Sequence, residues 1–155
     1  MDYLEAVPTF EHTRASGWPW LAARLLGALA LLATGAVHRQ QYLRLYSEIP
    51  TIGTLFVLNF AAATVIGLAL MAPLERIAHT PSALPALLAA AGILLAGTSF
   101  AFLLISEHTP LFGFMEPGYD PTAIAAARGA EIATVVFLGA FGAHQAMVTF
   151  QGGRR

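Results

Sequence analysis

Cysteine is absent from this 155-residue chain, and so is lysine. Without cysteine the protein has no disulfide, thiolate nucleophile, cysteine-ligated zinc or iron–sulfur cluster. All eight basic residues are arginines, and the formal net charge is only −1. A chain with this charge offers no basic face to a phosphate backbone, so we do not expect nucleic acid among its partners.

Charged residues of either sign are also scarce. They make up 11% of the sequence, against 57% hydrophobic residues. A water-soluble domain carries roughly 25% charged and about 45–50% apolar residues. This chain lacks the charge to cover a surface in water, which predicts that its partner is the lipid bilayer. In lipid every backbone polar group needs an internal hydrogen bond, and helices provide this.

Long apolar runs are what the sequence has instead. A membrane-spanning helix needs about 20 mainly apolar residues, and four stretches qualify, at 18–37, 52–73, 84–106 and 130–150. They predict an all-α, polytopic membrane protein, a single four-helix transmembrane bundle. Asp120 and Pro121 form a cap and first-turn pair, which predicts that the last helix begins there, before its apolar part.

The N-terminal segment carries Asp2, Glu5 and Glu11 before the first apolar run. A secretory signal peptide has a positively charged segment at that place. We therefore expect the first run to be retained as a membrane span.

Arginines predict the orientation. With four spans, five of them fall on the side of the termini (Arg14, Arg24, Arg76, Arg154 and Arg155) and three on the other (Arg39, Arg44 and Arg128). The positive-inside rule then favours a bacterial inner-membrane protein with cytoplasmic termini.

Two loops on the opposite side are unusually apolar. In the first, Tyr42, Leu45, Tyr46 and Ile49 repeat with helical spacing, which predicts a short helix lying in the membrane interface. The second, at 107–120, is expected to dip into the headgroup region or to pack under the first loop or a partner. It contributes Leu111, Phe112, Phe114 and Met115. These eight residues are the predicted partner interface. Our leading hypothesis is a non-catalytic accessory subunit of a larger inner-membrane complex, for example a respiratory or other redox complex.

Polar groups inside the spans are costly and are often functional. Asn59 is expected to form a hydrogen bond across helices. Glu131 follows Arg128 by three residues, and the favoured interpretation is an ion pair on the helix surface. The alternative is that Glu131 faces the bundle interior and carries protons in a small proton-coupled carrier.

Histidines are the candidate cofactor ligands. His38 and His108 are predicted at similar depth on the same side, where they would ligate haem or a metal in a membrane oxidoreductase. We rank this alternative below the accessory subunit, because neither residue has a partner at ligand spacing. No nucleophile elbow, phosphate loop or paired-carboxylate motif is present, so no catalytic residue is predicted.

Small residues mark the expected helix contacts, because lipid tails do not drive helices together and close packing needs small side chains. They are Ala28 and Gly35 in the first span, Gly92, Ala96 and Ser99 in the third, and Gly139 and Ala143 in the fourth.

The run from His38 to Asn59 (HRQQYLRLYSEIPTIGTLFVLN), with Leu111-Phe112-Gly113-Phe114, resembles small four-helix integral membrane proteins of GC-rich bacteria. The likeness covers roughly half the chain. The protein is also similar to DoxX-type membrane proteins, in size and span count alone. The resemblance implies four spans and an outward-facing pair of loops, and it assigns no catalytic residue.

Overall fold

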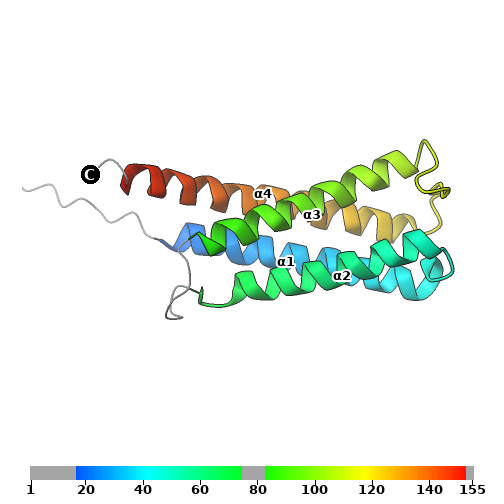
Figure 1. Cartoon of the computed structure of the whole chain (residues 1–155), viewed down its shortest axis with the longest axis horizontal. Helices are drawn as coiled ribbons and strands as arrows, with labels where there is room; N and C mark the ends of the chain where they lie inside the picture. The colour runs from blue at the N-terminus through cyan, green and yellow to red at the C-terminus, as the bar shows by residue number, and fades with distance from the viewer. Residues whose placement is uncertain (1–16, 75–82, 153–155) are drawn as a thin grey trace, which may run out of the picture.

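Four long helices make up the part of the chain that the computed structural model describes, residues 17–74 and 83–152 (Figure 1). They are α1 (Trp18–Gln41), α2 (Pro50–Met71), α3 (Leu84–Ser106) and α4 (Pro121–Gly152), and a π-helical turn, η1 (Tyr42–Tyr46), follows α1. All four helices are long and apolar enough to cross a membrane. The predicted all-α fold with four spans is confirmed. Asp2, Glu5, Glu11, Arg14, Arg76, Arg154 and Arg155, used above for retention and orientation, lie outside the described residues.

Each helix begins with a proline in its first turn. Pro19, Pro50, Pro85 and Pro121 occupy the first or second position of α1, α2, α3 and α4. A first-turn residue has no partner for its N–H inside the helix, so proline loses nothing there and its fixed φ favours the helix. Asp120 accepts the N–H of Ala123 at 3.0 Å, which confirms the predicted cap of α4.

The helices run alternately up and down (Figure 1). One end of the bundle, here called the terminal end, holds the start of α1 and the end of α4. The opposite end, the loop end, holds residues 42–49 and 107–120. Helix α1 packs extensively against α2 and α4, and α4 packs against α3, whereas α2 and α3 touch each other much less.

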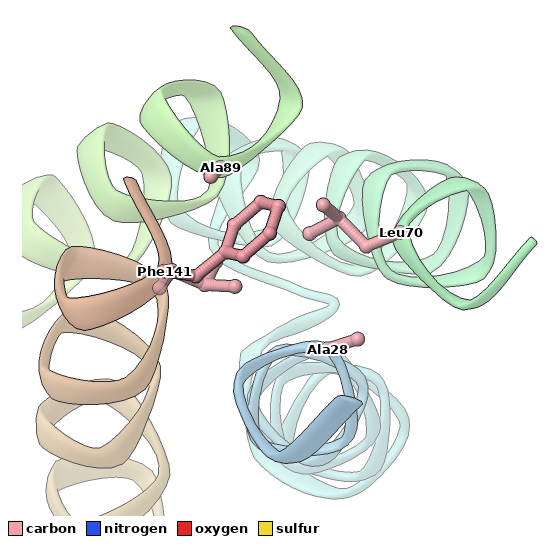
Figure 2. Packing of buried hydrophobic residues seen from close by; sticks show 5 residues of the cluster. Ala28, Leu70, Ala89 and Phe141 are labelled. Carbon is pink, nitrogen blue, oxygen red and sulfur yellow. The ribbon is translucent and has the colours of Figure 1, made fainter. Parts of the chain in front are cut away.

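The terminal half of the bundle is closely packed. Ala28, Leu70, Ala89 and Phe141, one from each helix, meet in a cluster that also contains Leu138 (Figure 2). These residues are almost fully shielded. This half therefore serves as the structural core.

Leu138 of α4 inserts between two glycines of neighbouring helices. A Cβ atom added at Gly27 of α1 would lie 2.5 Å from a Leu138 methyl carbon, and one at Gly92 of α3 would lie 2.8 Å from the other. These distances are shorter than real carbon contacts, so a larger residue at either position would force the side chain of Leu138 to move. The predicted packing role of Gly92 is thereby confirmed.

In the first span a predicted small residue also lies at a close helix contact, whereas in the fourth span the predicted small residues do not. A Cβ atom at Gly35 would lie 3.0 Å from the Cβ of Ala63, so this glycine lies at the predicted close contact. In contrast, a Cβ atom at Gly139 would meet nothing within 4 Å, and Ala143 is exposed. The predicted packing face of the fourth span is wrong, because α4 turns Leu138 and Phe141 inward instead.

The first loop is not a separate interfacial helix. Instead, η1 continues α1 directly, and the N–H of Ser47 donates to the carbonyl of Tyr42 across the wider π-helical turn at 3.1 Å. The extra residue in this turn rotates the following side chains relative to a regular helix. As a result Tyr46 points into the bundle rather than along a surface stripe.

The second loop folds back over the end of the bundle. Leu111 and Phe114 exchange two backbone hydrogen bonds around Phe112 and Gly113, which have φ values of 52° and 82°. Positive φ at both central residues is typical of a type I′ turn, and the conformation is strained for phenylalanine. The N–H of Glu116 then donates to the carbonyl of Ser106 at 2.8 Å. The loop is thereby tied to the end of α3.

Candidate functional site

A cavity of about 370 Å³ occupies the loop half of the bundle. All four helices, η1 and the second loop contribute to its walls, and α2 and α3 together supply half of the lining residues. Large apolar side chains form most of the lining, including Leu55, Phe56, Leu95, Phe102, Leu103, Phe114 and Ile124. This loop-end cavity is of the size that small ligands occupy in proteins, roughly 300–1,000 Å³.

A histidine and a serine meet at the wall. The Nδ1 of His38 lies 2.9 Å from the carbonyl oxygen of Thr34, one turn earlier in α1. A carbonyl only accepts, so Nδ1 carries the proton of this bond. The Nε2 of His38 lies 3.0 Å from the hydroxyl of Ser99 in α3. In the neutral imidazole the hydroxyl therefore donates to Nε2, and the bond joins α1 to α3.

Glu131 of α4 lies near the same serine. Its side chain is only 1% exposed, lines the cavity, and has Ser99 as a hydrogen-bonding neighbour. The predicted surface ion pair between Arg128 and Glu131 is wrong. Arg128 instead forms its ion pair with Glu107, at the start of the second loop. A spacing of three residues allows an ion pair on one face of a helix. Here, however, Glu131 faces the interior of the bundle, and Arg128 reaches outward to Glu107.

Three of the residues that line the cavity each have a buried side-chain oxygen without a hydrogen-bond partner within the described part of the chain. These oxygens are Oε1 of Gln41, Oδ1 of Asn59 and Oε2 of Glu131, from α1, α2 and α4. We call them the open acceptors. Asn59 was expected to bond across helices, and its oxygen does not. An unmet buried polar group costs about 1–3 kcal/mol, so three in one cavity indicate a role other than stability.

The other two carboxylates at the cavity are already satisfied. Glu116 accepts hydrogen bonds from the hydroxyl of Tyr46 and from the N–H groups of Gly118 and Tyr119. Asp120 accepts from Ala123 and from the side-chain amide of Gln41, the latter at 3.0 Å. Both residues therefore hold the loop in place.

The bond from Gln41 also defines the orientation of its amide. A carboxylate only accepts, so the nitrogen of Gln41 must face Asp120. The oxygen of Gln41 is then the buried atom of this side chain that has no partner among the described residues. Asp120 thus closes the loop end and at the same time positions one of the open acceptors.

Asp120 makes the loop attachment sensitive to acid. The N–H of Ala123 and the side chain of Gln41 both donate to this carboxylate and hold the pKa of Asp120 below its usual value of 3.8. A lowered pKa in the folded state means that the stabilisation is present above 3.8 and is lost as the pH falls through the folded-state value. We therefore expect the backbone protection of the first turn of α4 to fall several-fold on acidification.

Hydrogen–deuterium exchange, corrected for the intrinsic rate at each pH, measures this change. The variant Asp120→Asn should show lower protection near neutral pH and little further loss in acid. If wild type and variant lose protection in parallel as the pH falls, another carboxylate is responsible, and Asp120 does not control the attachment.

The eight residues of the predicted partner interface divide into three groups. Tyr46, Leu111 and Phe114 line the cavity, and the ring of Tyr46 lies edge-on to that of Phe114 with centroids 5.6 Å apart. Phe112 and Met115 are more than half exposed, at 57% and 51%. Of the other three residues, Leu45 is exposed, and Tyr42 and Ile49 are half-buried. The two loops therefore pack on each other, and only part of the predicted face remains outward.

The two predicted cofactor histidines do not come together. His38 lines the cavity, and both of its ring nitrogens have partners inside the bundle. His108 is exposed, does not line the cavity, and has its Nδ1 2.9 Å from the carbonyl of Leu104. No group of three or more metal-ligating side chains occurs within residues 17–74 and 83–152. A shared haem or metal site at this pair is thus not supported by its geometry.

Sequence reasoning missed two of the polar groups at the site. The sequence predicts Ser99 as a small packing residue, and Gln41 falls in the first loop, between the predicted spans at 18–37 and 52–73. Both belong to helices, and Gln41 is only 5% exposed. A polar side chain within an otherwise apolar helix is the sequence signal that could have identified both residues. That they line the same cavity depends on the rotation of each helix about its own axis, which the sequence pattern does not give.

Three comparisons with known proteins bear on the identity of the chain. No protein-family model matches the sequence, and no curated protein or solved structure matches it either. The resemblance to small bacterial membrane proteins therefore stays a prediction, and the loop-end cavity is the feature that points to a function.

Proposed function

We propose that this protein binds a small lipophilic molecule with a hydrogen-bond-donating head group in the loop-end cavity. The observation that supports this is the combination of apolar walls with three open acceptors from three different helices. Ligand sites in proteins are usually apolar cavities with a few convergent polar groups. An apolar ligand body would fill the space between α2 and α3, and its head would donate to the oxygens of Gln41, Asn59 and Glu131.

The membrane setting is part of the proposal. From the arginine distribution we expect the termini in the cytoplasm of a bacterium, and the loop end would then lie at the outer face of the inner membrane. The cavity would then lie in the outer half of the bilayer, within reach of molecules dissolved in that leaflet. A carrier that uses Glu131 as its protonatable group is compatible with this site, since Glu131 and Asn59 line the same cavity.

An accessory-subunit role is the second candidate. Exposed apolar side chains at the loop end favour it, namely Leu43, Leu45, Phe112, Met115 and Tyr119. Such a cluster suits contact with another membrane protein. This hypothesis stays a prediction, which the proteins that co-purify in mild detergent would test.

Filling the cavity tests the binding function. Ala127 of α4 lines it and is nearly buried, so Ala127→Phe should block the space and weaken ligand binding at least tenfold. The probe is aminoanthracene, whose fluorescence rises in apolar sites, titrated into the protein in lipid nanodiscs. Ala125→Phe is the matched control, because Ala125 is exposed on the same helix and does not line the cavity.

The expected result is saturable fluorescence with wild type and Ala125→Phe, and a strongly reduced signal with Ala127→Phe. Empty nanodiscs correct for partitioning of the probe into lipid. Equal signals from wild-type protein and empty nanodiscs, or equal affinity in both variants, would contradict a binding cavity.

A further inference from the structure

We infer that the head group of the ligand is a cation, a lipophilic amine in its protonated form, and that its binding at Glu131 releases one proton. This inference rests on the proposed binding function and names its ligand class. The structural basis is a buried carboxyl group with an unpartnered oxygen, on a cavity wall whose polar groups are rich in acceptors and poor in cations.

The charge balance of the cavity wall supports a cation. Three carboxyl groups line it, those of Glu116, Asp120 and Glu131. The chain has no lysine, and no arginine is among the described residues that line the cavity. A site of this composition repels anions and favours a positive head group.

Glu131 is the carboxyl group that remains available to a ligand. Protein hydrogen bonds already occupy the oxygens of Glu116 and Asp120, whereas Oε2 of Glu131 has no partner in residues 17–74 and 83–152. An ionised carboxylate without a counter-ion is costly in a medium of low dielectric constant. A bound ammonium group supplies both the missing charge and the missing hydrogen-bond donor.

The surrounding groups fit an ammonium head with an apolar body. The open oxygens of Asn59 and Gln41 accept hydrogen bonds, and an ammonium group has donors and no acceptor. Three aromatic rings also line the cavity, those of Phe56, Phe102 and Phe114. Aromatic faces attract cations, and the attraction is stronger where the pair is shielded from water.

Few titratable groups other than Glu131 itself could respond to a bound cation at this site. From α1, His38 reaches it through Ser99 of α3. On α4, Arg128 acts on Glu131 through space, but Glu107 already pairs with its guanidinium group. From α2 the polar neighbour on the cavity wall is Asn59, which does not titrate, and the loop contributes only Glu116 and Asp120.

The proton balance follows from these groups. In the empty cavity these three groups are all neutral. The protonated carboxyl group of Glu131 donates to the hydroxyl oxygen of Ser99, and this hydroxyl donates to Nε2 of His38. When the ammonium group binds, the carboxyl O–H bond breaks, the electron pair stays on the carboxylate, and the proton leaves for bulk water. Transfer to His38 would place a second positive charge beside the bound cation, so release is favoured.

A matched ligand pair tests the inference. Phenylbutylamine is a cation near neutral pH, and phenylbutanol has the same apolar body with a neutral head. We expect wild-type protein in nanodiscs of neutral lipid to bind the amine about tenfold more tightly than the alcohol, measured by displacement of aminoanthracene. From about pH 5 to about pH 8 the affinity for the amine should rise, and that for the alcohol should stay constant.

Glu131→Gln keeps the size and polarity of the side chain and removes its charge. This variant should lose the preference for the amine, and the pH dependence with it, while it binds phenylbutanol as wild type does. Retained alcohol binding also shows that the variant is folded. In weakly buffered solution, wild-type protein should release about one proton for each amine bound, which needs no substitution.

The inference is overturned if wild type binds alcohol and amine equally, if no proton is released, or if Glu131→Gln weakens both ligands alike. Each of these outcomes leaves the binding function in place. Failure of the binding function has a different signature, because then neither ligand displaces the probe from the cavity.

Discussion

Leu138→Ala is expected to lower the free energy of unfolding by about 1–3 kcal/mol. Leu138 is fully buried and fills the space above Gly27 and Gly92, so its removal leaves a void between α1, α3 and α4. In a water-soluble core such a substitution costs about 2–5 kcal/mol, which combines transfer from water with the cavity. In a membrane, leucine on a separated helix still lies in lipid, so unfolding does not transfer it to water. The cost of the substitution is then mainly that of the void left between the helices.

Unfolding of the purified protein by sodium dodecyl sulfate in mixed micelles, followed by circular dichroism, measures this loss. Leu94→Ala is the control, since it makes the same chemical change on α3 at a side chain that is 70% exposed. If both variants unfold alike, Leu138 does not lock the helices together, and the packing described for the terminal half is wrong.

Glu131→Leu is expected to raise the free energy of unfolding by about 1–3 kcal/mol, in the opposite direction to most core substitutions. The carboxyl group is buried, and one of its oxygens has no partner within the described residues. A leucine of similar size removes this cost and packs against the apolar wall. Replacing imperfectly satisfied buried polar groups with apolar ones is often neutral or stabilising.

The same variant should no longer bind phenylbutylamine. A gain in stability together with a loss of binding distinguishes a ligand-binding group from a structural one, because functional sites commonly reduce stability. Glu107→Leu is the comparison, since it removes the partner of Arg128, and we expect no gain from it. A clear loss of stability in Glu131→Leu would show that the carboxyl group holds the bundle together.

Much of the fold was predictable from composition and local spacing. A chain with so little charge cannot cover itself in water, and four apolar runs of the right length leave helices as the way to satisfy the backbone. The start of α4 at Pro121 followed from Asp120, and the contacts at Gly35 and Gly92 followed from residue size. These features depend on neighbours in the sequence, which is why they required no structure.

The predictions that failed concern directions around a helix axis. Arg128 and Glu131 have the spacing of an ion pair, yet one reaches to Glu107 and the other turns inward. Tyr46 belongs to the surface stripe that the sequence predicts. In the structure, the π-helical turn of η1 directs its side chain into the cavity. In a transmembrane helix both faces are apolar, so hydropathy does not tell the lipid-facing side from the buried one.

The amino-acid sequence alone therefore indicates that this protein lies in lipid, and it determines the number of long apolar helices, the start of α4 and the close contacts at Gly35 and Gly92. Only the packed bundle shows which polar groups share a space. Gln41, Asn59, Ser99 and Glu131 lie on four different helices and meet at one cavity. Their meeting depends on the rotation of each helix about its axis, which is determined by contacts between residues far apart in the chain.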